Sequence, residues 1–312
     1  MHITNPTAVA ILEAANLLRS GALVAFPTET VYGLGGDATN DNTVAKIFSV
    51  KNRPSFKPLI VHGSSINAFK KIVIISDLAK KLAMQFWPGP LTMVLPSKDR
   101  SSISSLVSAG SNNIAVRVPN HKVALALLKI VNIPIVAPSA NVSGHISPTT
   151  AQHVVESLIC NLDMILDGGS CRVGIESTVI DLSTKVPTLL RPGGVTLEAL
   201  KDILGIIEIS DYDQMNSSLK YDDYIPSLPI RMNVITPRVG EALLAFGPTT
   251  KSQLNLSVSG DLTEAATNLF SMLRELDSNK YIAIAVMPIP EGGLGFAIND
   301  RLRRGIKKID DN

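Results

Sequence analysis

Several basic side chains of this 312-residue chain stand close to prolines, which restrict the backbone around them. Three belong to one run, Lys51-Asn-Arg-Pro-Ser-Phe-Lys57-Pro, directly before the apolar segment Leu59-Ile-Val. Another is Arg191, in Leu-Leu-Arg-Pro-Gly-Gly. The cations of Arg53, Lys57 and Arg191 can offset the charge of a triphosphate through charge-assisted hydrogen bonds. The pattern therefore predicts a polyphosphate site built from loops.

A hydroxyl-rich run, Pro138-Ser-Ala-Asn-Val-Ser-Gly-His-Ile-Ser-Pro148, lies between these basic segments. Two interpretations stay open. The side chains of such a run can satisfy their own backbone in a strand-to-helix turn. Alternatively, they bind a ligand, because Ser139 follows the predicted strand Ile135-Val-Ala and ligands of α/β proteins gather at the carboxyl ends of strands.

Common nucleotide and metal motifs are absent from the sequence. There is no G-x-x-x-x-G-K-[ST] run, so a nucleotide must be held without a P-loop. Gly33-Leu-Gly-Gly-Asp-Ala matches G-x-G-x-x-A, but it starts well after its strand and Arg53 stands where an acid is expected, so we interpret it as a tight glycine turn. The histidines and cysteines lack zinc-site spacing. We expect no protein metal site, and Mg²⁺ only as a companion of a bound polyphosphate.

Composition predicts a globular protein. The chain is 45% hydrophobic and 18% charged, enough apolar content for two cores, and its net charge of +2 is too small to indicate a nucleic-acid-binding face. No secretory signal or apolar run of membrane-spanning length, about 20 residues, is visible. We therefore expect a cytoplasmic protein without disulfides.

Short apolar strands alternate with helical patterns along the chain, which predicts an α/β fold. Strands expected at 164–166, 177–182 and 188–190 are too close for intervening helices, so a mixed sheet is expected. Asn5 is the expected cap of a first helix. We predict a catalytic domain over residues 1–208, a polar linker over 209–228 and a small α/β domain over 229–312.

The motifs resemble the L-threonylcarbamoyladenylate synthase family, the YrdC-type enzymes of tRNA modification, over roughly residues 7 to 200. The resemblance rests on these segments: Phe26-Pro-Thr-Glu-Thr-Val-Tyr-Gly-Leu, Lys51-Asn-Arg-Pro, Trp87-Pro-Gly-Pro-Leu-Thr, Val116-Arg-Val-Pro, Pro138-Ser-Ala-Asn-Val-Ser-Gly, Glu176-Ser-Thr-Val and Arg191-Pro-Gly-Gly. Gly260-Asp-Leu-Thr-Glu-Ala-Ala and Gly293-Leu-Gly-Phe-Ala-Ile-Asn-Asp-Arg-Leu are similar to the family's C-terminal domain. The implied fold is a twisted mixed sheet with a basic concave cavity, followed by a small Rossmann-like α/β domain.

The resemblance implies synthesis of L-threonylcarbamoyl-AMP and pyrophosphate from L-threonine, bicarbonate and ATP. The product would serve a tRNA threonylcarbamoyl transferase complex acting at adenosine 37, and direct tRNA binding by this chain stays open. No protein nucleophile is expected. Two alternatives are an RNA-binding module without catalysis and an accessory domain that depends on carbamoyl phosphate.

The resemblance also implies which residues meet each substrate. The expected ATP-binding residues are Arg53, Lys57, Asn113, Ser139, Ser147, Arg191 and Tyr224. The expected threonine-binding residues are Thr30, His62, Arg117, Ala137 and Ser177. Arg117 suits the α-carboxylate, because a planar guanidinium matches it with two hydrogen bonds. Glu29 and Glu176 receive no role beyond holding loops or a metal. Tyr224 lies in a linker that departs from the family's pattern. We expect this linker to form a loose lid over the ATP site.

Overall fold

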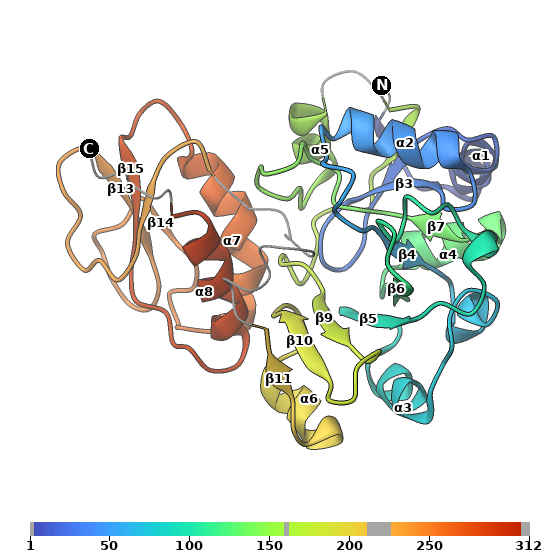
Figure 1. The fold of residues 1–312 in the computed structure, drawn as a ribbon. Helices are drawn as coiled ribbons and strands as arrows, with labels where there is room; N and C mark the ends of the chain where they lie inside the picture. The colour runs from blue at the N-terminus through green and yellow to red at the C-terminus, as the bar shows by residue number, and fades with distance from the viewer. Residues whose placement is uncertain (1–2, 159–161, 211–225, 307–312) are drawn as a thin grey trace.

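The computed structural model describes residues 3–158, 162–210 and 226–306. Within these ranges the chain forms two units, each built on its own sheet with helices packed against it (Figure 1). The larger sheet has eleven strands and the smaller has four. The larger sheet contains both parallel and antiparallel pairs, so the prediction of a mixed α/β sheet is confirmed.

The strands of the larger sheet follow one another in the spatial order β1-β8-β2-β3-β7-β4-β6-β5-β9-β10-β11. Their bounds are β1 (Ile3–Thr4), β2 (Val24–Phe26), β3 (Gly33–Asp37), β4 (Ile60–His62), β5 (Leu91–Pro96), β6 (Asn113–Arg117), β7 (Ile135–Val136), β8 (Met164–Leu166), β9 (Thr178–Asp181), β10 (Thr188–Arg191) and β11 (Glu208–Ile209). The helices of this unit are α1 (Ala8–Arg19), α2 (Asp41–Val50), η1 (Ile66–Phe69), α3 (Asp77–Phe86), η2 (Arg100–Ser102), α4 (Lys122–Val131), α5 (Ala151–Ser157) and α6 (Leu197–Leu204).

Alternating side chains place the two faces of the larger sheet in different surroundings. On β2, Ala25 packs into the main core with α2 and α3, whereas Val24 and Phe26 pack with α1 and α4. On β4, Val61 faces the main core, and its neighbour His62 points to the side on which Ile135 meets α4. On the face that carries His62, apolar helices α1 and α4 therefore cover the end near β2, and polar side chains occupy the part near β4.

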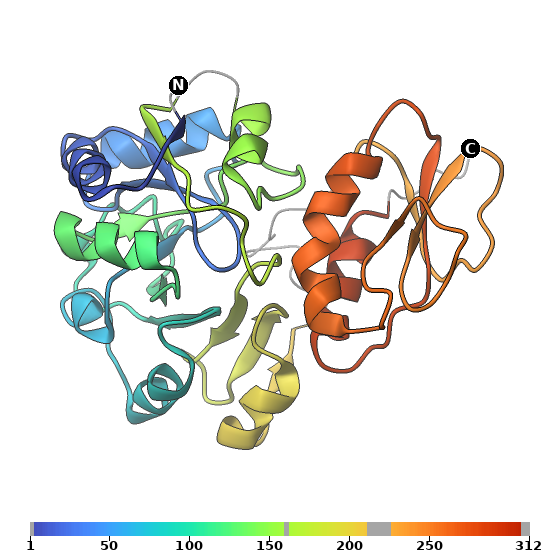
Figure 2. The same ribbon diagram turned by 180° about the vertical axis from the view of Figure 1, so that it is seen from behind.

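The smaller sheet has the order β12-β15-β13-β14, and its pairs are all parallel. Its elements are β12 (Ile230–Arg231), β13 (Glu241–Ala245), β14 (Leu254–Asn255), α7 (Leu262–Leu276), β15 (Ala283–Val286) and α8 (Leu294–Arg304). Helices α7 and α8 lie on the side of this sheet that faces the larger unit (Figures 1 and 2). The small α/β fold predicted for the end of the chain is therefore confirmed.

One detail differs from the sequence predictions, and one predicted segment lies mostly outside the described residues. The first helix is capped by Thr7, not Asn5, because the Thr7 hydroxyl accepts a hydrogen bond of 3.2 Å from the Ala10 amide. The greater part of the predicted linker, residues 211–225, lies outside the described residues. In the described part of the chain, no helix combines the length and the apolar character that a membrane crossing requires.

Candidate functional site

A pocket opens at the carboxyl ends of β4 and β6, at the face of the sheet that carries His62. It brings together residues that are far apart in the sequence. Its lining includes all the residues expected to bind threonine, namely Thr30, His62, Arg117, Ala137 and Ser177. It also includes Arg53, Ser139 and Arg191 from the set expected to bind ATP.

Among the described residues, three others expected to bind ATP are not part of the pocket lining, namely Lys57, Asn113 and Ser147. Asn113 begins β6, at the end opposite Arg117, and its amide donates a 2.8 Å hydrogen bond to the Ser183 hydroxyl. Lys57 offers its backbone carbonyl to Arg53 Nε at 3.4 Å. Ser147 is buried behind the pocket wall. Tyr224 lies outside the described residues.

Lys51 differs from the other cations of its run because it is fully buried. Its ammonium group donates hydrogen bonds to the backbone carbonyls of Ser139, at 2.6 Å, and Asn141. It therefore connects the basic run to the hydroxyl-rich run through backbone carbonyls. Arg53 extends from the same run into the pocket lining, and its Nη2 donates to the Pro58 carbonyl at 3.0 Å.

Both interpretations of the hydroxyl-rich run apply, each to a different residue. The Asn141 amide donates to the carbonyls of Val142 and His145, at 2.9 and 2.7 Å, so it stabilises its own turn. Ser139 instead lines the pocket. The turn is thus the support that places Ser139 at the pocket edge.

Arg117 ends β6 and forms an ion pair with a buried carboxylate. Its Nη2 lies 2.8 Å from Glu29 Oε1, and both side chains are buried. Its Nε also donates to the Gly89 carbonyl at 3.3 Å. Glu29, which received no role from the sequence, thus balances the charge of Arg117 in a buried ion pair.

His62 is a neutral, oriented imidazole. Burial and the adjacent Arg117 guanidinium lower the pKa of His62 to about 3, against an ordinary value of 6.5. Nδ1 lies 3.1 Å from the Ile60 carbonyl, which can only accept, so Nδ1 carries the proton. Nε2 is then a hydrogen-bond acceptor in the pocket.

Replacing His62 with glutamine should make the protein less sensitive to acid. A histidine whose pKa is lower when folded stabilises the protein above pH 6.5, and that stability is lost as the pH falls towards 3. At about two units below the ordinary pKa, the wild-type protein should have lost about 2.5 kcal/mol more stability than the variant. Urea unfolding at neutral pH and at pH about 4.5 measures the difference. Equal losses would contradict a buried neutral imidazole.

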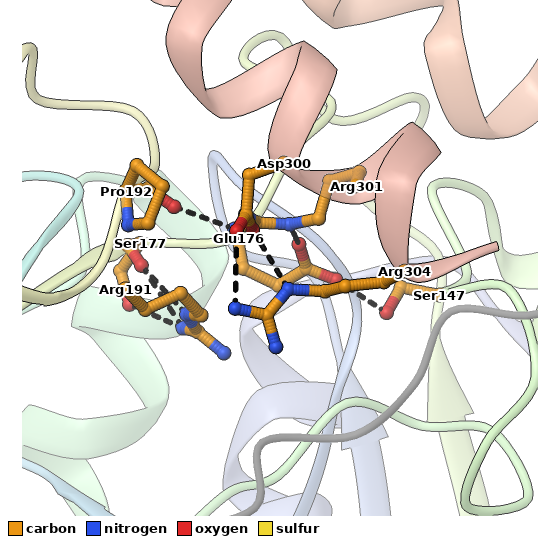
Figure 3. A network of polar contacts seen from close by, with 8 residues as sticks. All are labelled: Ser147, Glu176, Ser177, Arg191, Pro192, Asp300, Arg301 and Arg304. Atoms are coloured by element: carbon orange, nitrogen blue, oxygen red, sulfur yellow. Dashed lines mark hydrogen bonds and ion pairs between the residues drawn. The ribbon is translucent and has the colours of Figure 1, made fainter. Parts of the chain in front are cut away.

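Arg191, at the end of β10, forms part of the opposite wall and is 6% exposed (Figure 3). Its Nε and Nη2 donate to the Ser177 carbonyl at 3.1 and 3.0 Å, and Nη2 also reaches the Ser177 hydroxyl at 3.2 Å. That hydroxyl lies 2.8 Å from the hydroxyl of Thr92. Arg191 therefore orders the backbone and the side chain of a residue that itself lines the pocket.

Glu176 contacts the C-terminal unit, a feature that the sequence interpretation missed. Figure 3 shows Glu176 between Ser147 and Arg301 of α8: it accepts from Ser147 Oγ at 2.6 Å and from Arg301 Nε at 2.8 Å. One signal was available, because Arg301 falls on the stripe of α8 that also carries Ile298 and Leu302. A charged residue on the apolar face of a helix indicates a buried partner.

The pocket is suited to holding anions. Three guanidinium groups, those of Arg53, Arg117 and Arg191, line it. Burial raises the pKa of the nearby Cys171 thiol, so it is not a thiolate nucleophile. The described residues contain no cluster of three or more histidine, cysteine, aspartate or glutamate side chains that could hold a metal ion.

Comparison with known proteins gives matches over nearly the whole chain. A family model for Sua5, YciO and YrdC proteins, described as telomere recombination, matches residues 16–193, and a model described as the C-terminal domain of threonylcarbamoyl-AMP synthase matches residues 195–305. The threonylcarbamoyl-AMP synthase of Pyrococcus abyssi is 39% identical, with 93% of this chain and 92% of the relative covered. The protein of the same name from Bacillus subtilis is 38% identical, with 94% and 92% covered.

A solved structure agrees with these matches. The crystal structure of P. abyssi Sua5 complexed with L-threonine superposes with a TM-score of 0.86 at 38% identity, and covers 95% of this chain and 93% of that one. The agreement extends over both units, since both family models are matched in order. The chain therefore belongs to the Sua5/YciO/YrdC family, in the form that carries the threonylcarbamoyl-AMP synthase C-terminal domain.

Proposed function

We propose that this protein makes L-threonylcarbamoyl-AMP and pyrophosphate from L-threonine, bicarbonate and ATP. The observation that carries the proposal is the single pocket in which Arg117 and His62 adjoin Arg53 and Arg191. An amino acid and a polyphosphate can bind side by side in such a pocket, and the names of the relatives agree with this chemistry.

L-Threonine is assigned to the end of the pocket at β4 and β6. Arg117 meets the α-carboxylate, and Nε2 of His62 accepts a hydrogen bond from the amine or the hydroxyl. Thr30, Ala137 and Ser177 complete this part of the lining. Because the histidine ring is neutral, it adds no positive charge that would repel the ammonium group of free threonine.

ATP is assigned to the basic side of the pocket. Arg53 and Arg191 contact its phosphates, and the Ser139 hydroxyl donates a hydrogen bond. Ser147 supports this part of the pocket through its hydrogen bond to Glu176, and Lys57 lies in the loop that carries Arg53. Mg²⁺ is expected to enter with ATP, coordinated mainly by phosphate oxygens and water. Asn113 lies at the end of β6 opposite Arg117 and is assigned no ATP contact.

The reaction then requires alignment rather than a protein nucleophile. The neutral amine of threonine attacks the carbon of bicarbonate to form a carbamate, and the hydroxide that is displaced takes a proton from the nitrogen and leaves as water. A carbamate oxygen attacks the α-phosphorus of ATP, the bond to the bridging oxygen breaks, and pyrophosphate leaves. The guanidinium groups stabilise the charge that grows on pyrophosphate, and the walls of the pocket shelter the carbamate from water.

Pyrophosphate release, measured with each of the twenty amino acids, tests the proposal. Release that requires ATP, bicarbonate and threonine together is the expected result. Release that requires carbamoyl phosphate would favour the accessory-domain alternative. Salt-sensitive RNA binding without any pyrophosphate release would favour the RNA-binding module. The later use of the product by a tRNA threonylcarbamoyl transferase complex, in the cytoplasm where tRNA is modified, is part of the same proposal.

Replacing Arg117 with lysine should raise the KM for threonine by about tenfold and change the KM for ATP little. Lysine keeps the positive charge beside Glu29 but loses the fork that matches a carboxylate. Initial rates at varied threonine and varied ATP give the two constants. Arg100→Lys, at an exposed position, is the control. Equal increases in both constants would contradict the carboxylate role of Arg117.

A further inference from the structure

We propose that Arg301, in α8 of the C-terminal unit, is a positioning residue for the pocket. It holds two backbone segments of the pocket wall in register, and so places Ser177 and Arg191 for substrate binding. This inference rests on the proposed function, because it treats the pocket as the place where threonine and ATP bind.

The contacts of Arg301 cross between the two units. The side chain is 1% exposed. Its Nε donates to Glu176 Oε2 at 2.8 Å, and its Nη2 donates to the Pro192 carbonyl at 2.8 Å (Figure 3). One rigid guanidinium thus bridges two segments of the larger unit that are distant in sequence.

Each of these contacts is one residue away from a pocket residue. Glu176 precedes Ser177, and Pro192 follows Arg191. Arg191 donates hydrogen bonds to Ser177. The Gly194 amide also donates to the Glu176 carbonyl at 3.1 Å. Movement of Arg301 would therefore shift both sides of this wall together.

Charge balance gives Arg301 a second effect on the pocket. Glu176 lines the pocket, where an uncompensated carboxylate would repel a polyphosphate. Arg301 neutralises it, while Arg301 Nη1 and Arg304 Nε hold Asp300 at 2.6 and 2.8 Å. Two arginines and two acids thus form a neutral group at the boundary between the units.

Helix α7 contacts the same wall independently. The hydroxyl of Thr267 donates to the Arg172 carbonyl at 2.8 Å. A Cβ on Gly174 would lie 2.4 Å from Thr267 Cα, so that loop packs its backbone directly on α7. The segment leading to Glu176 and Ser177 is therefore supported by both helices of the C-terminal unit, and Arg301 is the charged contact among these supports.

The test compares Arg301→Met with Arg303→Met in the full-length protein. Methionine preserves much of the arginine stem but removes the hydrogen bonds to Glu176, to the Pro192 carbonyl and to Asp300. Arg303 lies on the same helix, is exposed and pairs with Glu291, so it is the matched control. We expect Arg301→Met to raise the KM for ATP at least about tenfold, because small misplacements of binding groups are costly, and Arg303→Met to leave it unchanged. Titration calorimetry with a non-hydrolysable ATP analogue should show the same loss of affinity.

A double variant separates positioning from a general loss of stability. If Glu176 and Arg301 act as one unit, Arg301→Met combined with Glu176→Gln should lose no more than the weaker-binding single variant. Losses that multiply, or a folded Arg301→Met with wild-type constants, would overturn the proposal. If Arg301→Met does not fold, Arg301→Lys decides: it keeps the charge but lacks the fork, so an unchanged KM for ATP would overturn the proposal and a rise of at least about threefold would support it.

If the proposed function is wrong, the experiments give a different result from the one expected if only the role of Arg301 is wrong. In that case the wild-type protein would release no pyrophosphate with threonine. The calorimetric comparison of wild-type and variant proteins would still report whether Arg301 positions the nucleotide-binding wall.

Discussion

Replacing Glu29 with alanine should lower the free energy of unfolding by about 3–5 kcal/mol, the usual cost of leaving a buried charge without its partner. Glu29 is fully buried and Arg117 is 4% exposed, so water cannot take the place of the lost carboxylate. The guanidinium would keep only its 3.3 Å hydrogen bond to the Gly89 carbonyl among the contacts described above. Urea unfolding at neutral pH measures the change.

Two further variants show whether the loss comes from the unpaired charge. Glu29→Ala combined with Arg117→Met removes both charges and should be more stable than Glu29→Ala alone, because apolar groups can replace a buried ion pair. Asp77→Ala breaks the exposed pair with Lys80 and should leave the unfolding midpoint nearly unchanged. A Glu29→Ala protein as stable as the wild type would show that Arg117 finds another partner.

Local patterns in the sequence predicted the elements better than their arrangement. Strands β8 (Met164–Leu166) and β10 (Thr188–Arg191) lie where the apolar runs at 164–166 and 188–190 predicted them. The pairing of β2 with β8 could not be predicted in the same way. It joins strands about 140 residues apart, Val24 with Met164, and no local periodicity specifies such a partner.

The same limit applies to the candidate site. Proline-flanked cations and a strand-end serine pointed to Arg53, Arg191 and Ser139, which all line the pocket. The partners of Glu29 and Glu176 were not predicted, because each acid meets an arginine far away in the sequence. In both cases the sequence supplied the buried charge, and only the fold supplies the group that balances it.

Replacing Gly193 with alanine should reduce pyrophosphate release by about a hundredfold, because it pushes apart the two segments that carry Arg191 and Ser177. A Cβ at this position would lie 2.4 Å from the Glu176 carbonyl oxygen and 2.5 Å from Thr178 N. Backbone atoms cannot rotate away as a side chain can, so the segments must separate. Overpacking of this kind also costs about 1–3 kcal/mol of stability.

Gly292→Ala is the matched control, since a Cβ there meets nothing within 4 Å and its backbone is in an ordinary conformation. It should retain wild-type stability and activity. In Gly193→Ala, the loss should appear in the constants for both substrates, because Ser177 is assigned to threonine and Arg191 to ATP. A Gly193→Ala protein that keeps both constants would mean that the distance between the two segments does not control binding, and it would also weaken the case for Arg301 as the residue that sets this distance.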